Sequence, residues 1–203
     1  MPLAGTIFDL DGTLVDSQLD FDAIRRDMGL SAGQLILEGL EQMPEGDAKD
    51  ECRRVLEHHE REGAARAVPI PGVEELLAEL DDLQIVRAIL TRNSRVSAET
   101  TLAKLGWEFS IVLTREDVPP KPDPAGLVRI CAEWDLAVDE VLFFGDFAFD
   151  LQAGRNAGMR TVLYAPGDPP DYADLADYTI EHFRDAIPLV RQLAGTTRRP
   201  ESE

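Results

Sequence analysis

The chain has 203 residues, of which 44% are hydrophobic, and this is enough for one well-packed core. Its formal net charge of −19 repels nucleic acid and anionic membrane surfaces, so we expect neither as a partner. The same charge repels phosphate esters, so any phosphate site must be built locally from a metal ion, a lysine and backbone N–H groups.

The N-terminal segment and the cysteines favour a cytoplasmic protein. The opening residues lack a basic region, and their apolar stretch is interrupted by Asp9 and Asp11, so they indicate a strand and not a signal peptide. No apolar run approaches the roughly 18 residues that span a bilayer. Cys52 and Cys131 have neither disulfide nor zinc-ligand spacing, which fits a reducing cytosol. Composition leaves the choice between monomer and homodimer open.

The first predicted element is a buried strand at residues 4–9, a short apolar run that ends in acids. Apolar residues at helical spacing then dominate residues 17–68, with breaks at Gly29 and at 44–46. We therefore predict a helical insert at 17–68.

Strands and helices alternate after the insert. Predicted strands cover 84–90, 109–113, 140–146, 160–165 and 178–180, and predicted helices cover 71–83, 94–105, 122–135, 151–158 and 183–194. Pro188 implies that the last helix is kinked or begins near that residue. Such alternation predicts an α/β fold, with a parallel sheet covered by helices on both faces.

Ligands of parallel sheets bind beyond the carboxyl ends of the strands, where this chain carries polar residues. Asp9 and Asp11 end the first strand and can diverge at the Gly12 turn around one reacting centre. Two carboxylates at one site can divide the roles of nucleophile and proton donor. Asp-Gly is also a common turn dipeptide, so a simple turn remains an alternative.

A second pair of acids, Asp146 and Asp150, follows the strand at 140–146. Their spacing brings both carboxylates to one side of a strand-to-helix junction, and oxygen ligands of this kind suit Mg²⁺. The alternative is that they are acids favoured by the dipole of the following helix.

Two further strand ends carry groups that suit a phosphate. The Thr91 hydroxyl and the backbone N–H groups after it predict a phosphate cradle, and Asn93 or Ser94 serves equally well as a helix cap. Lys121 lies between prolines that restrain the backbone, which favours a positioned charge over a mobile surface lysine.

Taken in order, these segments resemble the motifs of the haloacid dehalogenase-like (HAD) hydrolase superfamily, and within it the phosphoglycolate-phosphatase-like group. The resemblance covers about residues 4–194. The four matching motifs are FDLDGTLVDS at 8–17, Thr91 at the end of ILT, Lys121 before Pro122, and GDFAFD at 145–150. The resemblance implies a Rossmann-like core domain at 1–16 and 69–194 and a short helical cap at 17–68. The polar composition of residues 195–203 predicts a disordered tail.

The resemblance also implies a Mg²⁺-dependent phosphatase that acts on a small phosphorylated metabolite. Asp9 would attack phosphorus and form an aspartyl-phosphate. Asp11 would protonate the leaving alcohol and then activate water.

The resemblance assigns ligands as well. Mg²⁺ would be held by Asp9, the main-chain carbonyl of Asp11 and Asp146, with Asp150 in support. The phosphoryl oxygens would be held by Thr91, the amide of Arg92 and Lys121.

Phe147 departs from the family, which commonly has a small hydroxyl residue there, and with Phe149 it is expected to narrow the mouth or to meet the cap. Specificity is expected in residues 17–68 and at Arg92, Asn93 and Phe147. Four cap arginines are candidates for a substrate carboxylate, or else surface charges: Arg25, Arg26, Arg53 and Arg54.

Three other functions are alternatives to a phosphatase. A phosphomutase of the same fold would act on a sugar phosphate and would also need Asp11. A dehalogenase would need neither Asp11 nor Mg²⁺. A non-catalytic binding protein on this fold would normally lack one of the four acids, all of which are present.

Overall fold

The computed structural model describes residues 1–195, and in this part of the chain six parallel strands form one sheet in the order β5-β4-β1-β6-β7-β8. The strands are β1 (Gly5–Phe8), β4 (Val86–Leu90), β5 (Ile111–Leu113), β6 (Val141–Gly145), β7 (Arg160–Tyr164) and β8 (Tyr178–Ile180). The predicted parallel α/β sheet is confirmed, with strand ends that differ from the predicted ones by at most two residues.

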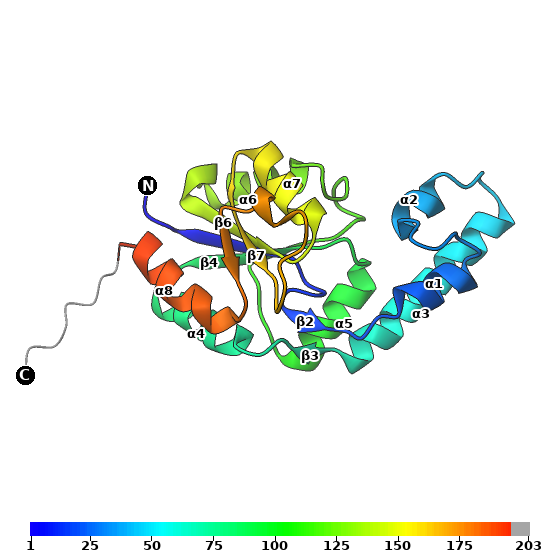
Figure 1. Cartoon of the computed structure of the whole chain (residues 1–203), viewed down its shortest axis with the longest axis horizontal. Coiled ribbons are helices and arrows are strands. Elements are labelled where there is room, and N and C mark those ends of the chain that lie inside the picture. The colour runs from blue at the N-terminus through cyan, green and yellow to red at the C-terminus, as the bar shows by residue number, and fades with distance from the viewer. Residues whose placement is uncertain (196–203) are drawn as a thin grey trace, which may run out of the picture.

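Helices cover both faces of this sheet (Figure 1). They are α4 (Val73–Asp82), α5 (Arg95–Leu105), α6 (Ala125–Trp134), α7 (Ala148–Ala157) and α8 (Phe183–Leu193). Adjacent strand residues point to opposite faces, so Phe8 packs in one core cluster with residues of α4, α5 and α8, whereas Ile7 packs in another with residues of α6 and α7. The fold is therefore Rossmann-like.

The order of the strands changes direction at β1. From β1 the chain passes to β4 and β5 on one side of the sheet, and then returns to β6, β7 and β8 on the other side. A crevice forms at the carboxyl end of the strand where such a reversal occurs. Asp9 follows β1 directly and therefore stands at this crevice.

Three helices lie beside the sheet, between the short strands β2 (Val15–Asp16) and β3 (Val68–Pro69) (Figure 1). They are α1 (Phe21–Asp27), α2 (Ile36–Glu41) and α3 (Asp47–Arg66), and we call them the helical insert. The insert has its own apolar cluster, which includes Ile24, Met28, Leu40 and Leu56. β2 and β3 pair antiparallel where the chain leaves and re-enters the sheet domain. The division into domains at 17–68 stays a prediction.

Caps in the first turn fix where the last two helices begin. α8 begins at Phe183 as predicted, and the alternative start near Pro188 is wrong, since the His182 ring accepts the Arg184 N–H at 3.0 Å and Asp185 accepts the His182 N–H at 3.1 Å. α7 begins at Ala148, and not at residue 151.

The predicted disorder of 195–203 falls almost wholly on residues 196–203, which lie outside the described residues. Among residues 1–195, the helices are all too short or too polar to cross a membrane.

Candidate active site

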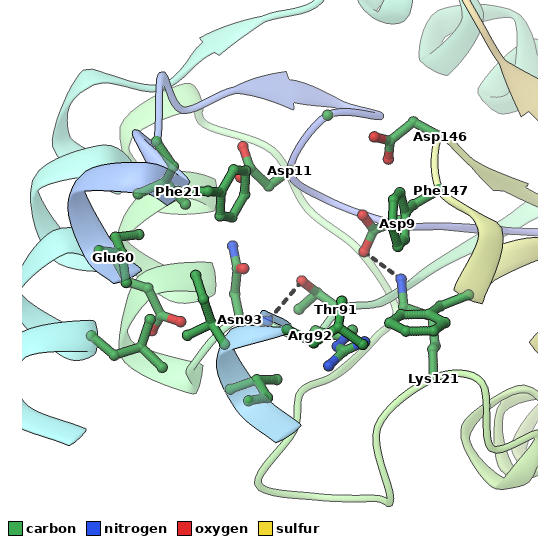
Figure 2. A pocket seen from close by; sticks show the side chains of 18 of the residues that line it. Asp9, Asp11, Phe21, Glu60, Thr91, Arg92, Asn93, Lys121, Asp146 and Phe147 are labelled. Carbon is green, nitrogen blue, oxygen red and sulfur yellow. Dashed lines mark hydrogen bonds and ion pairs between the residues drawn. The ribbon is translucent and has the colours of Figure 1, made fainter. Parts of the chain in front are cut away.

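A pocket of about 420 Å³ lies between the strand ends and the helical insert. Its walls include every site residue that the sequence predicted: Asp9, Asp11, Thr91, Arg92, Lys121, Asp146 and Asp150. Figure 2 shows Asp9, Lys121 and Asp146 on one side of this space, with Asp11 and Phe21 on the other. Residues from four strand ends thus meet in one cavity, as the sheet topology requires.

Lys121 is the centre of the charged groups at the strand ends. Its side chain is buried, and its Nζ lies 2.6 Å from Asp9 Oδ1 and 2.5 Å from Asp150 Oδ1. The sequence alternative of a mobile surface lysine is therefore wrong. Burial alone would lower the pKa of Lys121, but the charges of Asp150 and Asp9 outweigh burial and raise it, so the side chain stays protonated.

Three carboxylates form a cluster that suits a metal ion. One oxygen from each of Asp9, Asp146 and Asp150 lies within 4.8 Å of the others. Burial raises the pKa of Asp9 to about 6, although Lys121 opposes the shift. Burial, and then the charges of Asp9 and Asp150, raise the pKa of Asp146 to about 8. One lysine does not neutralise three carboxylates, so the donor set fits a hard divalent cation.

The turn after β1 brings the backbone close to Asp146. Gly12 has a φ of +83°, a conformation that costs residues with a Cβ, and a Cβ built there would collide with the Asp146 carboxylate. The next residue, Thr13, donates its hydroxyl to Asp146 Oδ1 at 2.9 Å. Gly12 and Thr13 therefore position Asp146, a role that the sequence analysis did not assign although both residues lie in the first motif.

Asp150 combines the two roles that the sequence left open. Its Oδ2 accepts the Phe147 N–H at 3.0 Å and caps the first turn of α7. Its Oδ1 faces Lys121. The capping bond thus fixes the orientation of the Asp150 carboxylate within the three-carboxylate cluster.

Asp11 points away from the three-carboxylate cluster. Its Oδ1 accepts hydrogen bonds from the Ser17 hydroxyl and, at 3.1 Å, from the Ser17 N–H. Burial raises the pKa of Asp11, although the two bonds from Ser17 oppose the shift. The two aspartates of the first motif therefore diverge, and Asp11 has the environment of a carboxyl that can hold a proton.

Thr91 and the residues after it form a polar corner of the pocket. The Thr91 hydroxyl is buried and accepts the Asn93 N–H at 3.1 Å (Figure 2). The cap of α5 is Ser94, whose side chain accepts the Ser97 N–H at 3.3 Å. The Thr91 hydroxyl only accepts in its bond with Asn93, and Ser94 provides the helix cap. The hydroxyl proton of Thr91 is therefore available to a ligand.

Arg92 joins the strand ends to the helical insert. Its Nη2 lies 2.6 Å from Glu38 Oε1 of α2, and its guanidinium lies over the Phe149 ring, 4.6 Å from the ring centre. Phe147 packs edge-on against Phe149. Phe149 thus meets the insert through Arg92, and both aromatic rings line the pocket.

A buried ion pair makes a second connection to the insert. Glu60 of α3 is only 4% exposed and pairs with both terminal nitrogens of Arg115, which also donates to the Arg92 carbonyl at 3.1 Å. The roles of Glu60, Arg115 and Glu38 were not predicted from the sequence. Their partners are far away in the sequence, and the only signal was an acid on an otherwise apolar helix face.

The four cap arginines separate into two groups. Arg25 lines the pocket, where it donates to the Gln34 carbonyl at 2.8 Å and pairs with Asp22 at 2.7 Å. The other three, Arg26, Arg53 and Arg54, pair with nearby acids outside this pocket. For these three the surface-charge interpretation is correct.

Comparison with known proteins identifies the family. The family model for haloacid dehalogenase-like hydrolases matches residues 17–164. A haloacid dehalogenase-like hydrolase domain-containing protein of Arabidopsis thaliana is 32% identical, over 82% of this chain and 75% of its own length. An N-acetylmuramic acid 6-phosphate phosphatase of Pseudomonas putida is 31% identical, over 90% of this chain and 93% of its own.

A solved structure has the same fold. The crystal structure of a predicted phosphoglycolate phosphatase from Haemophilus somnus superimposes with a TM-score of 0.74, over 92% of this chain and 97% of its own, at 23% identity. The chain belongs to the haloacid dehalogenase-like hydrolase family, and it is an enzyme of the phosphoric monoester hydrolase class.

Proposed function

We propose that this hydrolase releases phosphate from a small-molecule phosphate monoester in two steps, through an aspartyl-phosphate at Asp9. The observation that carries the proposal is the environment of Asp9. It stands in the pocket at the switch point of the sheet, with Lys121 at 2.6 Å and two further carboxylates in reach. A nucleophile, its orienting cation and a metal-ligand set thus occur together.

In the first step, a carboxylate oxygen of Asp9 forms a bond to phosphorus while the bond from phosphorus to the ester oxygen breaks. Asp11 gives its proton to that leaving oxygen, which departs as the alcohol. The hydrogen bonds from Ser17 hold Oδ1 of Asp11, which leaves its second oxygen for the proton. The raised pKa of Asp11 favours the protonated form that this step needs.

In the second step, Asp11 takes a proton from water, and the water oxygen bonds to phosphorus. The bond between phosphorus and Asp9 then breaks, so inorganic phosphate leaves and the Asp9 carboxylate is restored. Lys121, the Thr91 hydroxyl and the Arg92 amide would hold the phosphoryl oxygens in both steps. Lys121 also fixes one oxygen of Asp9 and thereby limits how the carboxylate can turn.

Mg²⁺, held by Asp9, Asp146, the Asp11 main-chain carbonyl and Asp150 in support, would supply the positive charge that lets an anionic nucleophile meet an anionic ester. The fit of these residues to a divalent cation supports this choice, since oxygen ligands at this spacing suit Mg²⁺.

The test is hydrolysis of 4-nitrophenyl phosphate with Mg²⁺ and with a chelator. We expect phosphate release that depends on Mg²⁺ and returns when the metal is restored. Activity that survives complete chelation would refute the proposal. The same enzyme preparation tests the phosphomutase alternative. A mutase would convert a hexose phosphate to its isomer with little phosphate release.

A further inference from the structure

The pocket has an excess of acid beyond what the proposed chemistry uses. Seven carboxylates and three cations occur among the described residues that line it. The acids are Asp9, Asp11, Asp16, Glu38, Glu60, Asp146 and Asp150, and the cations are Arg25, Arg92 and Lys121. A divalent cation would offset part of this excess, and the phosphate of the substrate would add to it.

The three cations already have anionic partners. Lys121 lies between Asp9 and Asp150, Arg92 pairs with Glu38, and Arg25 pairs with Asp22. Aside from the phosphate site itself, the described walls therefore offer no uncompensated positive charge to a second anion on the substrate.

Glu38 projects from the insert toward the strand ends, as its contact with Arg92 requires. Only Oε1 is used in that contact, at 2.6 Å. Oε2 is buried and has no hydrogen-bond partner among the described residues. The Glu38 side chain as a whole is 37% exposed and lines the pocket, so a ligand that brings a hydroxyl or ammonium donor would be favoured beside this carboxylate.

Apolar side chains form the rest of the rim. Phe21 is 50% exposed, Leu35 is 40% exposed and Phe147 is 45% exposed, and all three line the pocket. In Figure 2 the Asn93 side chain points toward Phe21 and so adds a polar group on that side. Carbon surface with a few hydrogen-bonding groups suits a polyol or amino alcohol.

We propose that the substrate is the phosphate ester of an alcohol that carries hydroxyl or amino groups near the ester and no carboxylate there, and that Glu38 selects for it. This inference rests on the proposed function for the phosphate end of the pocket. A carboxylate in the same position would approach Glu38 as a like charge, without a free cation to offset it.

The test compares three esters of similar size: 2-hydroxyethyl phosphate, 2-aminoethyl phosphate and phosphoglycolate. We expect kcat/KM for the hydroxyl and amino esters to exceed that for phosphoglycolate by about tenfold or more. Glu38→Gln removes the charge and should reduce the preference for the amino ester over phosphoglycolate by about tenfold. Each ratio is taken within one variant, so a general loss of activity does not affect it.

The matched control is Glu41→Gln, an exposed acid of the same helix that does not line the pocket. It should leave the three ratios unchanged. The proposal is overturned if wild-type enzyme prefers phosphoglycolate, or if Glu38→Gln leaves the preferences as they were.

Binding of the three esters to Asp9→Asn with Mg²⁺, measured by calorimetry, separates this inference from the proposed reaction. The same order of affinities without turnover by wild-type enzyme would support the charge selection and refute the phosphatase mechanism. Turnover of 4-nitrophenyl phosphate with no preference among the three esters would support the phosphatase mechanism and refute the charge selection by Glu38.

Discussion

The two walls of the pocket are built in different ways. On the sheet side, Asp9, Thr91 and Asp146 follow directly from strands whose hydrogen bonds fix the backbone. On the insert side, Glu38 and Glu60 project from helices that reach the strand ends through ion pairs with Arg92 and Arg115. We propose from this difference that the sheet side carries the reaction and that the placement of the insert decides which ester fits.

The largest effect is expected on the sheet side, at Asp9. Asp9→Asn keeps the shape of the side chain but removes the nucleophile, so kcat should fall on the order of 10³-fold or more. Steady-state hydrolysis of 4-nitrophenyl phosphate measures this loss. An Asp9→Asn enzyme with undiminished kcat would show that the sheet-side wall does not carry the chemistry.

A large effect is also expected at Gly12. In Gly12→Ala the added Cβ would collide with Asp146, so we expect Mg²⁺ affinity to fall by about tenfold or more, with activity falling at subsaturating metal. Titration of activity against Mg²⁺ concentration measures this shift.

Gly33→Ala is the matched control for Gly12→Ala. Gly33 also has a positive φ, of +75°, but a Cβ there would meet nothing within 4 Å. Both variants bear the same kind of backbone strain, of about 1 kcal/mol, and only Gly12→Ala should change the metal dependence. Equal metal dependence in the two variants would contradict the role given to Gly12.

The ion pair between Arg115 and Glu60, which connects the two walls, should contribute to the free energy of unfolding. Arg115→Ala leaves Glu60 buried without its partner, so we expect the free energy of unfolding to fall by about 3 kcal/mol. Denaturant unfolding measures this loss. Arg129→Ala breaks an exposed pair with Glu133 and should cost only about 0.5 kcal/mol. Equal losses in the two variants would show that the Glu60 pair does not hold the insert.

A further effect is expected on the pH dependence of stability. The folded-state pKa of Asp146, about 8, is above its ordinary value of 3.8, so the folded chain binds this proton more tightly than the unfolded chain does. The proton on Asp146 makes its full contribution to the free energy of unfolding below pH 3.8, and this contribution is lost as pH rises through about 8. Without metal, Tm should therefore fall as pH rises from 5 to 8.

Mg²⁺ should oppose this fall, because the cation binds the ionised cluster and stabilises the folded state. Asp146→Asn is the control, and its Tm should depend less on pH and on Mg²⁺. A metal-free wild-type protein whose Tm rises over the same range, measured by differential scanning calorimetry, would contradict the account of the cluster.

The sheet-side wall was predictable from the sequence because its functional residues stand one or two positions after apolar runs. Asp9 and Thr91 each follow a buried strand, and a parallel sheet brings such positions to one edge. Thr13 and Ser17 lie within the first motif, but the hydrogen bonds of their hydroxyls to Asp146 and Asp11 became known only from the structure.

The insert-side wall was not predictable in the same way. Glu38 meets Arg92, and Glu60 meets Arg115, only because the insert docks on the strand ends, and no local pattern encodes that docking. The strands β2 and β3, of two residues each, are too short to give a periodic signal. Helix periodicity located α1, α2 and α3, but their placement depends on tertiary packing.

The most direct test of the central claim is a crystal structure of the protein with Mg²⁺ and fluoroberyllate, a mimic of the phosphoryl group. The account predicts beryllium bonded to a carboxylate oxygen of Asp9, with Lys121 and Thr91 in contact with the fluorides. Fluoroberyllate bound at another residue, with Asp9 free, would contradict it.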